Sequence, residues 1–245
     1  MKVFIGTANI TDAPALLKQG FRKLGYEADV GLVNCSHKFY ATPGNDVDVP
    51  GLIASTKVDV RDSCMTVHPP AEFFEIARHY ELFVFIASSS LLPRLCDLPL
   101  LQQMGKKVVC YQTGSELRHE LTAEPFWRMY GYEFPSDAYH TCRDESGKIV
   151  LWWRGQAFTH TLVNKLYNTR MADRYATTIC THPSIFTLGV RPHMAIQLPM
   201  DADKCTFRIP RNRIPLVVHA PSNRAVKRSD IILNTLLELK EEGVP

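Results

Sequence analysis

The sequence lacks the features that mark membrane-spanning and secreted proteins. No apolar run in it reaches the length of about 18 residues that a membrane-spanning helix needs. Residues 1–6 enter an apolar strand pattern directly, without the charged, apolar and small-residue parts of a secretory leader. From these two absences we expect a soluble, cytoplasmic protein, for which peripheral contact with a membrane stays open.

The sequence also lacks a large excess of charge of either sign. It contains 28 Lys and Arg residues and 25 Asp and Glu residues, which give a formal net charge of +3. Nucleic-acid binders usually gather basic residues on one face or helix, so we expect no nucleic-acid partner. The 7 cysteines are scattered and form no CxxC pair, which disfavours zinc and redox sites. We expect reduced thiols, with Cys110 and Cys180 in the core, and neither a metal nor a cofactor.

What the sequence does contain is an alternation of apolar runs with amphipathic segments. Residues 2–5 and 27–33 predict strands on either side of a helix at 13–24, which Gly25 ends. Further strands are predicted at 82–87, 107–111, 175–180 and 195–198, and further helices at 71–80, 98–104 and 158–172. This alternation predicts an α/β fold with a Rossmann-like parallel sheet layered with helices.

Two stretches interrupt the alternation. Residues 34–70 are rich in Pro, Gly, Asp and Ser, and predict loops around short strands such as 57–60. Residues 199–213 contain two prolines and four basic residues without a clear period, which is typical of an exposed connection between domains.

The last part of the chain repeats the strand, loop and helix order of its beginning. A strand is expected at 215–220 and an amphipathic helix at 229–242. One strand and one helix bury too little apolar surface to form a domain, so we expect an incomplete second Rossmann-like domain. The resulting division assigns 1–200 to the first domain, 201–213 to the linker and 214–245 to the start of the second domain.

Five passages in a fixed order point to a known family. They are TANITDAPALLKQGFRKLGYEADV (7–30), SSLLPRLCDLPLLQQMGKKVVCYQTGSELR (89–118), TICTHPSIF (178–186), IQLPMD (196–201) and HAPSNRAVKRSDIILNTLLELKEEG (219–243). In this order they resemble the retaining group 1 glycosyltransferases of the GT-B fold. The resemblance implies an acceptor-side domain, a linker and the start of a donor domain.

The same resemblance implies an activity and its participants. A full-length version would transfer a sugar from a nucleotide diphosphate donor to a carbohydrate or lipid-linked acceptor, as in polysaccharide biosynthesis, without an obligatory metal. The nucleotide sugar is then a substrate, and no cofactor is expected. This chain alone should have little activity, because the donor site would be split across a missing half.

The resemblance places the donor pyrophosphate at the loop after the strand expected at 215–220. Ser222, Arg224 and Lys227 are the candidate phosphate ligands, since a loop before a helix offers free N–H groups and basic side chains add charge-assisted bonds. The alternative is that these are solvated loop charges. Arg228 stands where many relatives have glycine, so it either crowds the phosphates or adds a third basic contact.

On the acceptor side, the loops after the strands at 2–5 and 107–111 are expected at the carboxyl edge of the sheet, where open α/β sheets bind ligands. The candidate cleft residues there are Thr7, Asn9, Gly114, Ser115, Glu116 and Arg118. Helix capping is the alternative for Ser115, and we prefer it for Asp12. Trp152 and Trp153 could stack on sugar rings, but packing is the more frequent role of such a pair.

Two histidines that relatives often place near the reacting sugar are missing. Their positions read Ile86-Ala87-Ser88 and Gln112-Thr113, so we assign no catalytic residue. This absence keeps open a non-catalytic module that binds a glycan or a partner. A nicotinamide-dependent oxidoreductase is disfavoured, because residues 6–11 contain one glycine instead of a tight glycine fingerprint.

Overall fold

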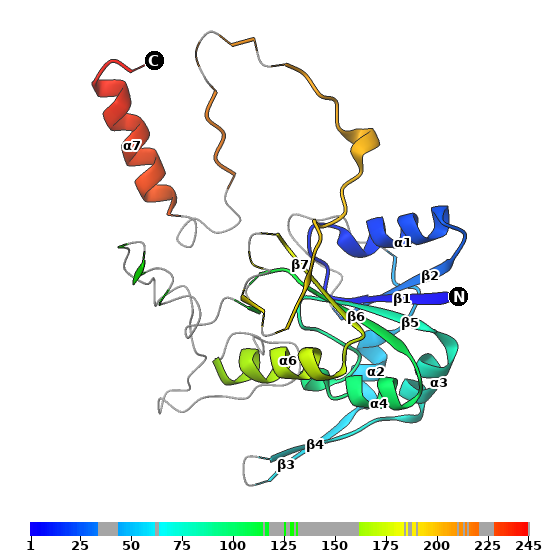
Figure 1. The fold of residues 1–245 in the computed structure, drawn as a ribbon. Coiled ribbons are helices and arrows are strands. Elements are labelled where there is room, and N and C mark those ends of the chain that lie inside the picture. Colours follow the sequence, from blue (N-terminus) through cyan, green and yellow to red (C-terminus); the bar gives the residue numbers. More distant parts are fainter. Residues whose placement is uncertain are drawn as a thin grey trace.

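The chain folds as alternating strands and helices (Figure 1). In the computed structural model, the described residues are 1–33, 44–61, 64–114, 116–117, 125, 128–129, 131, 162–183, 185, 188–189, 191–209, 211–212, 214, 216–220 and 228–244. Their elements are β1 (Lys2–Thr7), α1 (Ala13–Lys23), β2 (Glu27–Leu32), α2 (Val49–Ser55), β3 (Lys57–Arg61), β4 (Cys64–His68), α3 (Ala71–His79), β5 (Leu82–Ile86), η1 (Pro93–Leu95), α4 (Leu98–Gln103), β6 (Lys107–Gln112), α6 (Leu162–Tyr175), β7 (Thr178–Thr181), β8 (Met194–Ala195), η4 (Ala202–Lys204) and α7 (Ser229–Glu241).

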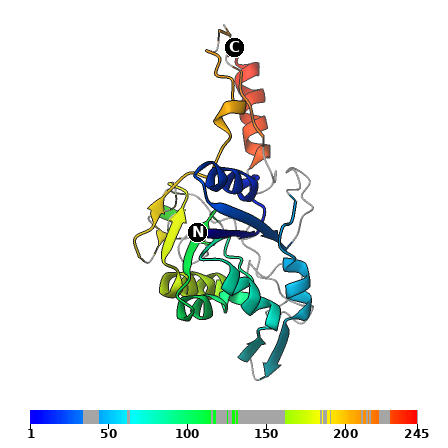
Figure 2. The same ribbon diagram turned by 90° about the vertical axis from the view of Figure 1, so that its right-hand side faces the viewer.

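Six of the strands form one sheet in the order β2-β1-β5-β6-β7-β8, and every pairing in it is parallel. The chain adds β2 on one side of β1 and then returns to add β5 on the other side. The direction of strand addition therefore reverses between β1 and β5, which is where open α/β sheets place their ligands. A separate antiparallel hairpin of β3 and β4 projects from the body (Figures 1 and 2).

Helices cover both faces of the sheet, α1 on one face and α2, α3, α4 and α6 on the other (Figures 1 and 2). Phe83 and Phe85 of β5 pack with Leu98 of α4 on the second face. Val84 and Ile86 of the same strand face the other way, into the core beneath α1. Because both faces are covered, β5 is apolar throughout. The described residues thus confirm the expected α/β fold with a Rossmann-like parallel sheet.

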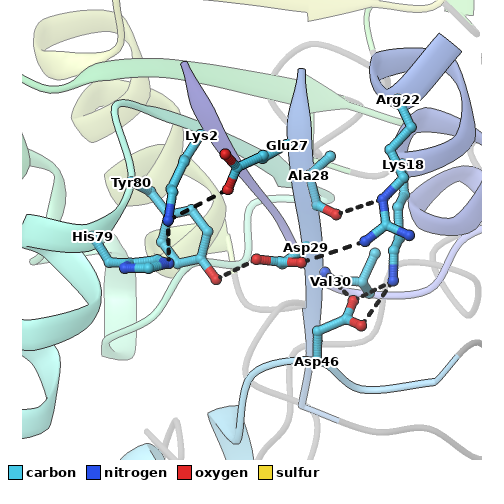
Figure 3. A network of polar contacts seen from close by, with 10 residues as sticks. All are labelled: Lys2, Lys18, Arg22, Glu27, Ala28, Asp29, Val30, Asp46, His79 and Tyr80. Carbon is cyan, nitrogen blue, oxygen red and sulfur yellow. Dashed lines mark hydrogen bonds and ion pairs between the residues drawn. The ribbon is translucent and has the colours of Figure 1, made fainter. Parts of the chain in front are cut away.

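Side chains close the outer edge of β2 in place of a further strand. Asp46 accepts the backbone N–H of Val30 at 2.8 Å, and Asn45 accepts that of Leu32 at 2.6 Å. Lys18 of α1 donates to both carboxylate oxygens of Asp46 (Figure 3). Burial acts to raise the pKa of Asp46, but the bonds from Lys18 and Val30 outweigh it and the net pKa is lowered. The cover removes an open strand edge, which is otherwise a template for aggregation.

Further contacts wrap around β2 from both faces of the sheet (Figure 3). Tyr80, which follows α3, donates its hydroxyl to Asp29 at 3.0 Å. Arg22 of α1 lies 3.6 Å from the other oxygen of Asp29 and donates to the carbonyl of Ala28 at 3.2 Å. Burial and then the bond to Asp29 raise the pKa of Tyr80. These contacts fix α1 and the end of α3 to the edge strand.

Most expected elements form within a residue or two of their predicted ends, but α2 was predicted as loop. Pro50 and Gly51 in this segment are typical of turns. In the structure Pro50 lies in the first helical turn, where a missing N–H costs nothing. Asp48 caps the helix by accepting the N–H of Gly51 at 2.9 Å. The same residue pattern that reads as a turn is therefore the start of a short helix.

The two strands predicted farthest along the chain were overestimated. β8 is confined to Met194–Ala195, although the sequence predicts 195–198. Residues 216–220 form no strand, and Leu216 and Val218 are 75% and 77% exposed. A strand needs a neighbour to pair its backbone groups, and in the described chain none lies beside this segment. The predicted helix that follows does form, as α7.

The core holds the two cysteines that were expected there. Cys110 and Cys180 are 5% and 7% exposed, and both are free thiols. Burial raises the pKa of Cys110 to about 12, so this thiol stays protonated at neutral pH. In the described ranges, no helix has the length and apolar character to cross a bilayer.

Candidate functional site

The carboxyl ends of β1 and β5 meet where the strand order reverses. Thr7 ends β1, and its hydroxyl contacts the Ser89 hydroxyl and donates to the Ser90 carbonyl at 3.3 Å. Ala87 and Ser88, which follow β5, are left-handed with φ of 59° and 50°. Such conformations are uncommon without glycine and gather at functional sites. The Ser88 hydroxyl oxygen is buried and has no hydrogen-bond partner.

Asp97 anchors the loop that follows β5. Its carboxyl group is fully buried, accepts the N–H of Leu91 at 3.1 Å and lies 2.5 Å from the Ser90 hydroxyl. That hydroxyl also lies 3.1 Å from the Leu92 carbonyl, yet it has a single proton for two acceptors. A protonated Asp97 resolves the conflict, because it donates to Ser90 while Ser90 donates to Leu92.

The electrostatics of Asp97 agree with this arrangement. Burial raises the pKa of Asp97 to about 7, although the bonds from Ser90 and the backbone act to lower it. The carboxyl group therefore keeps a proton up to neutral pH. Because both of its carboxyl oxygens have partners within the loop, Asp97 positions the loop.

Glu116 organises the loop that follows β6. Its carboxylate accepts the N–H of Gly114 at 2.8 Å and the N–H and hydroxyl of Thr113 at 3.3 and 3.1 Å. The side chain is buried at 6% exposure. Glu116 thus shapes its own loop, and its direct contact with an acceptor stays a prediction.

The structure brings several predicted residues to one edge of the sheet. Thr7 is the last residue of β1, Asn9 follows it, and Gly114 and Glu116 follow β6, with the end of β5 between them. Asn9 is buried at 8% exposure in the loop before α1. Four of the predicted cleft residues are therefore neighbours across three adjacent strands.

The other predicted residues are not all placed. Ser115, Arg118, Ser222, Arg224, Lys227, Trp152 and Trp153 lie outside the described residues. The expected cap at Asp12 was wrong in part, because Asp12 precedes α1 but its side chain makes no capping bond. Its φ of 58° is the physical reason, since a capping residue normally has an extended backbone.

Ser88, Ser89, Ser90 and Asp97 were missed by the sequence analysis. A run of serines after an apolar strand was the available signal, because parallel strands end at the same edge as their ligands. Asp97 precedes α4 and resembles an ordinary helix cap in the sequence. Its burial depends on how the loop folds back, which no local pattern reveals.

The described carboxyl edge consists mainly of neutral hydroxyl and amide groups. They come from Thr7, the three serines at 88–90, Gln112, Thr113 and Thr181, whose hydroxyl donates to the Gln112 carbonyl at 3.1 Å. Phosphate sites usually combine basic side chains with a helix amino terminus. The first turn of α1 does begin at this edge, but the side chains named above carry no positive charge. A neutral edge instead suits the hydroxyl groups of an uncharged ligand, each of which both donates and accepts.

An open groove of about 460 Å³ lies elsewhere, between β4, α3, α4 and α6. Its described lining is mostly apolar and includes Met65, Val67, Phe74, Leu100 and Tyr167. The groove offers shape and apolar contact but few polar groups that could orient a substrate. The carboxyl edge is therefore the stronger candidate for chemistry.

Three or more His, Cys, Asp or Glu side chains arranged for a metal ion are not found among the described residues. Comparison of the sequence with models of known protein families and with curated proteins yields no match. The fold and the chemistry of the carboxyl edge are therefore the features that bear on function.

Proposed function

We propose that this chain is the acceptor-side part of a nucleotide-sugar-dependent glycosyltransferase with two Rossmann-like domains. The enzyme transfers a sugar from a nucleotide diphosphate to a carbohydrate or lipid-linked acceptor. The supporting observation is the neutral, hydroxyl-rich carboxyl edge at the point where the strand order reverses. The order of the five family-like passages supports the same assignment.

The proposal gives different tasks to the two parts of the chain. In such a transfer the bond between the sugar and the leaving phosphate breaks, and an acceptor hydroxyl forms the new glycosidic bond as it loses its proton. Thr7 and Asn9 would help to position the acceptor hydroxyl, and positioning alone can supply a large part of the rate. Ser222, Arg224 and Lys227 would hold the leaving diphosphate and stabilise its charge.

The test is a transfer assay on the longest form of the protein that its gene encodes. We expect release of UDP or GDP from UDP-glucose, UDP-N-acetylglucosamine or GDP-mannose that increases when an acceptor glycan is added. Arg224→Ala and Lys227→Ala should each lower kcat/KM by about 10- to 100-fold, because each removes a charge-assisted bond to phosphate. Lys204→Ala is the matched control, since this lysine is 82% exposed in the linker and should leave turnover unchanged.

The alternative is a module that binds glycans without catalysis. Ala87-Ser88 and Gln112-Thr113 lie at the carboxyl ends of β5 and β6, at positions where relatives place histidines. Glycan binding without release of nucleotide from any of the three donors would contradict the transferase proposal and favour this module.

A further inference from the structure

The buried face of α6 changes from apolar to polar along its length. Toward its end, Ala172 and Ala176 pack into the core with Ile179 of β7. At helical spacing before them, the same buried face continues with Asn168 and Thr169, which are 6% and 5% exposed. The helix therefore buries polar side chains where a core helix normally buries apolar ones.

These polar residues lie level with the carboxyl edge of the sheet. Helix α6 leads into β7 and runs against it, so its first turns lie on the side where the strands end (Figure 1). From Tyr175 back to Thr169 the helix covers about 9 Å, and from Thr178 to Thr181 the strand covers about 10 Å. Thr181 pairs with Gln112 at the end of β6.

Gln112 points to the same side of the sheet as α6. Strand β6 alternates, and Val108 and Cys110 belong to the core on the α6 side. Gln112 follows them at the same period and is 1% exposed. The amide of Gln112 is thus buried on the face that Asn168 and Thr169 cover.

The three side chains share an unusual lack of partners. Both the amide nitrogen and oxygen of Gln112, the amide oxygen of Asn168 and the hydroxyl oxygen of Thr169 are buried without a hydrogen bond. Buried polar atoms are normally paired, and an unpaired group needs a physical explanation. Lys165, one turn earlier on this face, is buried and already engaged in an interaction.

We propose that Gln112, Asn168 and Thr169 form a subsite that binds hydroxyl groups of an uncharged sugar. The inference rests on the proposed function, and it assigns residues that read the acceptor. Amide and hydroxyl groups both donate and accept, as sugar hydroxyls do, so each missing bond can be supplied by one hydroxyl. The three side chains are neutral. The cations next to them are engaged elsewhere, since Lys165 already makes an interaction and Arg94 of η1 stacks on the Tyr167 ring, so a charged ligand would lose its hydration with little opposite charge in return.

The experiment measures sugar binding and stability together. Calorimetry and saturation-transfer NMR are applied to the chain with glucose, galactose, mannose and N-acetylglucosamine, and with glucuronic acid as the charged counterpart. We expect at least one neutral sugar to bind and glucuronic acid to bind at least 10-fold more weakly. Thr169→Val and Asn168→Leu should weaken binding at least 10-fold, because a site built for a hydroxyl loses its partner.

Stability separates a ligand subsite from a structural role. Without ligand, Thr169→Val and Asn168→Leu should raise the midpoint of thermal unfolding, because each removes an unpaired buried polar atom. Thr56→Val is the matched control. Thr56 is equally buried, but its hydroxyl donates to the Leu52 carbonyl at 2.8 Å, so this variant should lose stability and keep its sugar affinity.

Three results would overturn the subsite. The first is that the wild-type chain binds none of the four neutral sugars. The second is that the Thr169→Val and Asn168→Leu variants bind sugar as tightly as wild type does. The third is that both variants lose as much stability as Thr56→Val does. Sugar binding that meets the expectations above, without any transfer activity, leaves the subsite standing and contradicts only the transferase. If Thr169→Val and Asn168→Leu bind sugar as wild type does and transfer activity is present, only the subsite is contradicted.

Discussion

Asp97 makes the loop after β5 sensitive to a single proton. The Ser90 hydroxyl lies within reach of both the Asp97 carboxyl and the Leu92 carbonyl, and only one of the two can take its proton. A neutral carboxyl group satisfies every partner in this cluster, whereas a carboxylate leaves one acceptor short and a charge buried. The loop that contacts Thr7 is therefore most stable when Asp97 is protonated.

We predict a pH-dependent difference in stability between wild type and Asp97→Asn. Burial raises the pKa of Asp97 from 3.8 to about 7. The contribution of protonated Asp97 to the free energy of unfolding is therefore complete below pH 3.8 and is lost as pH rises to about 7. Asparagine can donate to Ser90 and accept from Leu91 without titrating. The free energy of unfolding of wild type relative to the variant should fall with a slope of up to about 1.4 kcal/mol per pH unit.

Urea unfolding of both proteins between pH 4 and pH 8 measures this difference. Groups such as Asp46, whose lowered pKa makes stability fall as pH decreases, are common to both proteins and cancel. A difference that stays constant across this range would show that Asp97 is ionised throughout.

At the scale of elements, β2 is stable as an edge strand because side chains replace the missing neighbour. Asn45 acts as a strand residue would, since it accepts the N–H of Leu32 at 2.6 Å and donates to the carbonyl of Leu32 at 3.1 Å. Asp46 extends the cover along the strand to Val30. These two side chains, together with the backbone N–H groups of Asp46 and Val47 that donate to the Val30 carbonyl, supply hydrogen bonds that a seventh strand would make.

Asn45→Ala should lower the free energy of unfolding by about 1–2 kcal/mol, because it removes two hydrogen bonds to the backbone of β2. The measurement is the midpoint of urea unfolding. Asn212→Ala is the control, since Asn212 is exposed and lies outside any helix or strand, so its replacement should leave the midpoint unchanged. An Asn45→Ala midpoint equal to that of Asn212→Ala would show that the cover does not stabilise the edge.

Elements with a complete local pattern were predictable from the sequence. Helix α1 has an apolar stripe and a glycine stop, and β5 is uniformly apolar, so both formed as predicted. Residues 216–220 have the composition of a strand, but a strand depends on a neighbour that may be distant in sequence. Helix α2 was missed because proline and glycine are ambiguous between a turn and a first helical turn.

The candidate site was predictable only where it follows from topology. Thr7 ends a strand, and Gly114 and Glu116 follow the end of another. Parallel strands bring their carboxyl ends to one edge. The importance of Asp97 and Thr169 depends on burial and on hydrogen-bond partners, which are properties of the folded chain. No spacing in the sequence separates a buried threonine with a partner from one without.

Across the described part of the molecule, two groups of polar side chains differ in how they are paired. Around β2 the charged side chains pair with one another and bind elements together (Figure 3). At the carboxyl edge the groups are mainly neutral, and several buried ones have no partner. Paired charges stabilise a fold, whereas unpaired buried groups that persist indicate a role outside folding.

Helix α7, near the end of the chain, exposes apolar side chains. Helix α7 stands apart from the sheet in Figure 1, and its Ile231, Leu233 and Leu237 are 48%, 52% and 59% exposed. Under the proposed function, a donor domain would cover these apolar side chains. Acceptor and donor would then meet between the two Rossmann-like parts.

The most direct test of the central claim is NMR titration of the ¹⁵N-labelled chain with the four neutral sugars. We expect amide shift changes at the ends of β1, β5 and β6, in particular at Thr7, Ser90 and Gly114, and unchanged amides at Asp29 and Asp46 in the network around β2. Shift changes confined to the β2 network or to the groove beside α4, with the carboxyl edge unaffected, would contradict it.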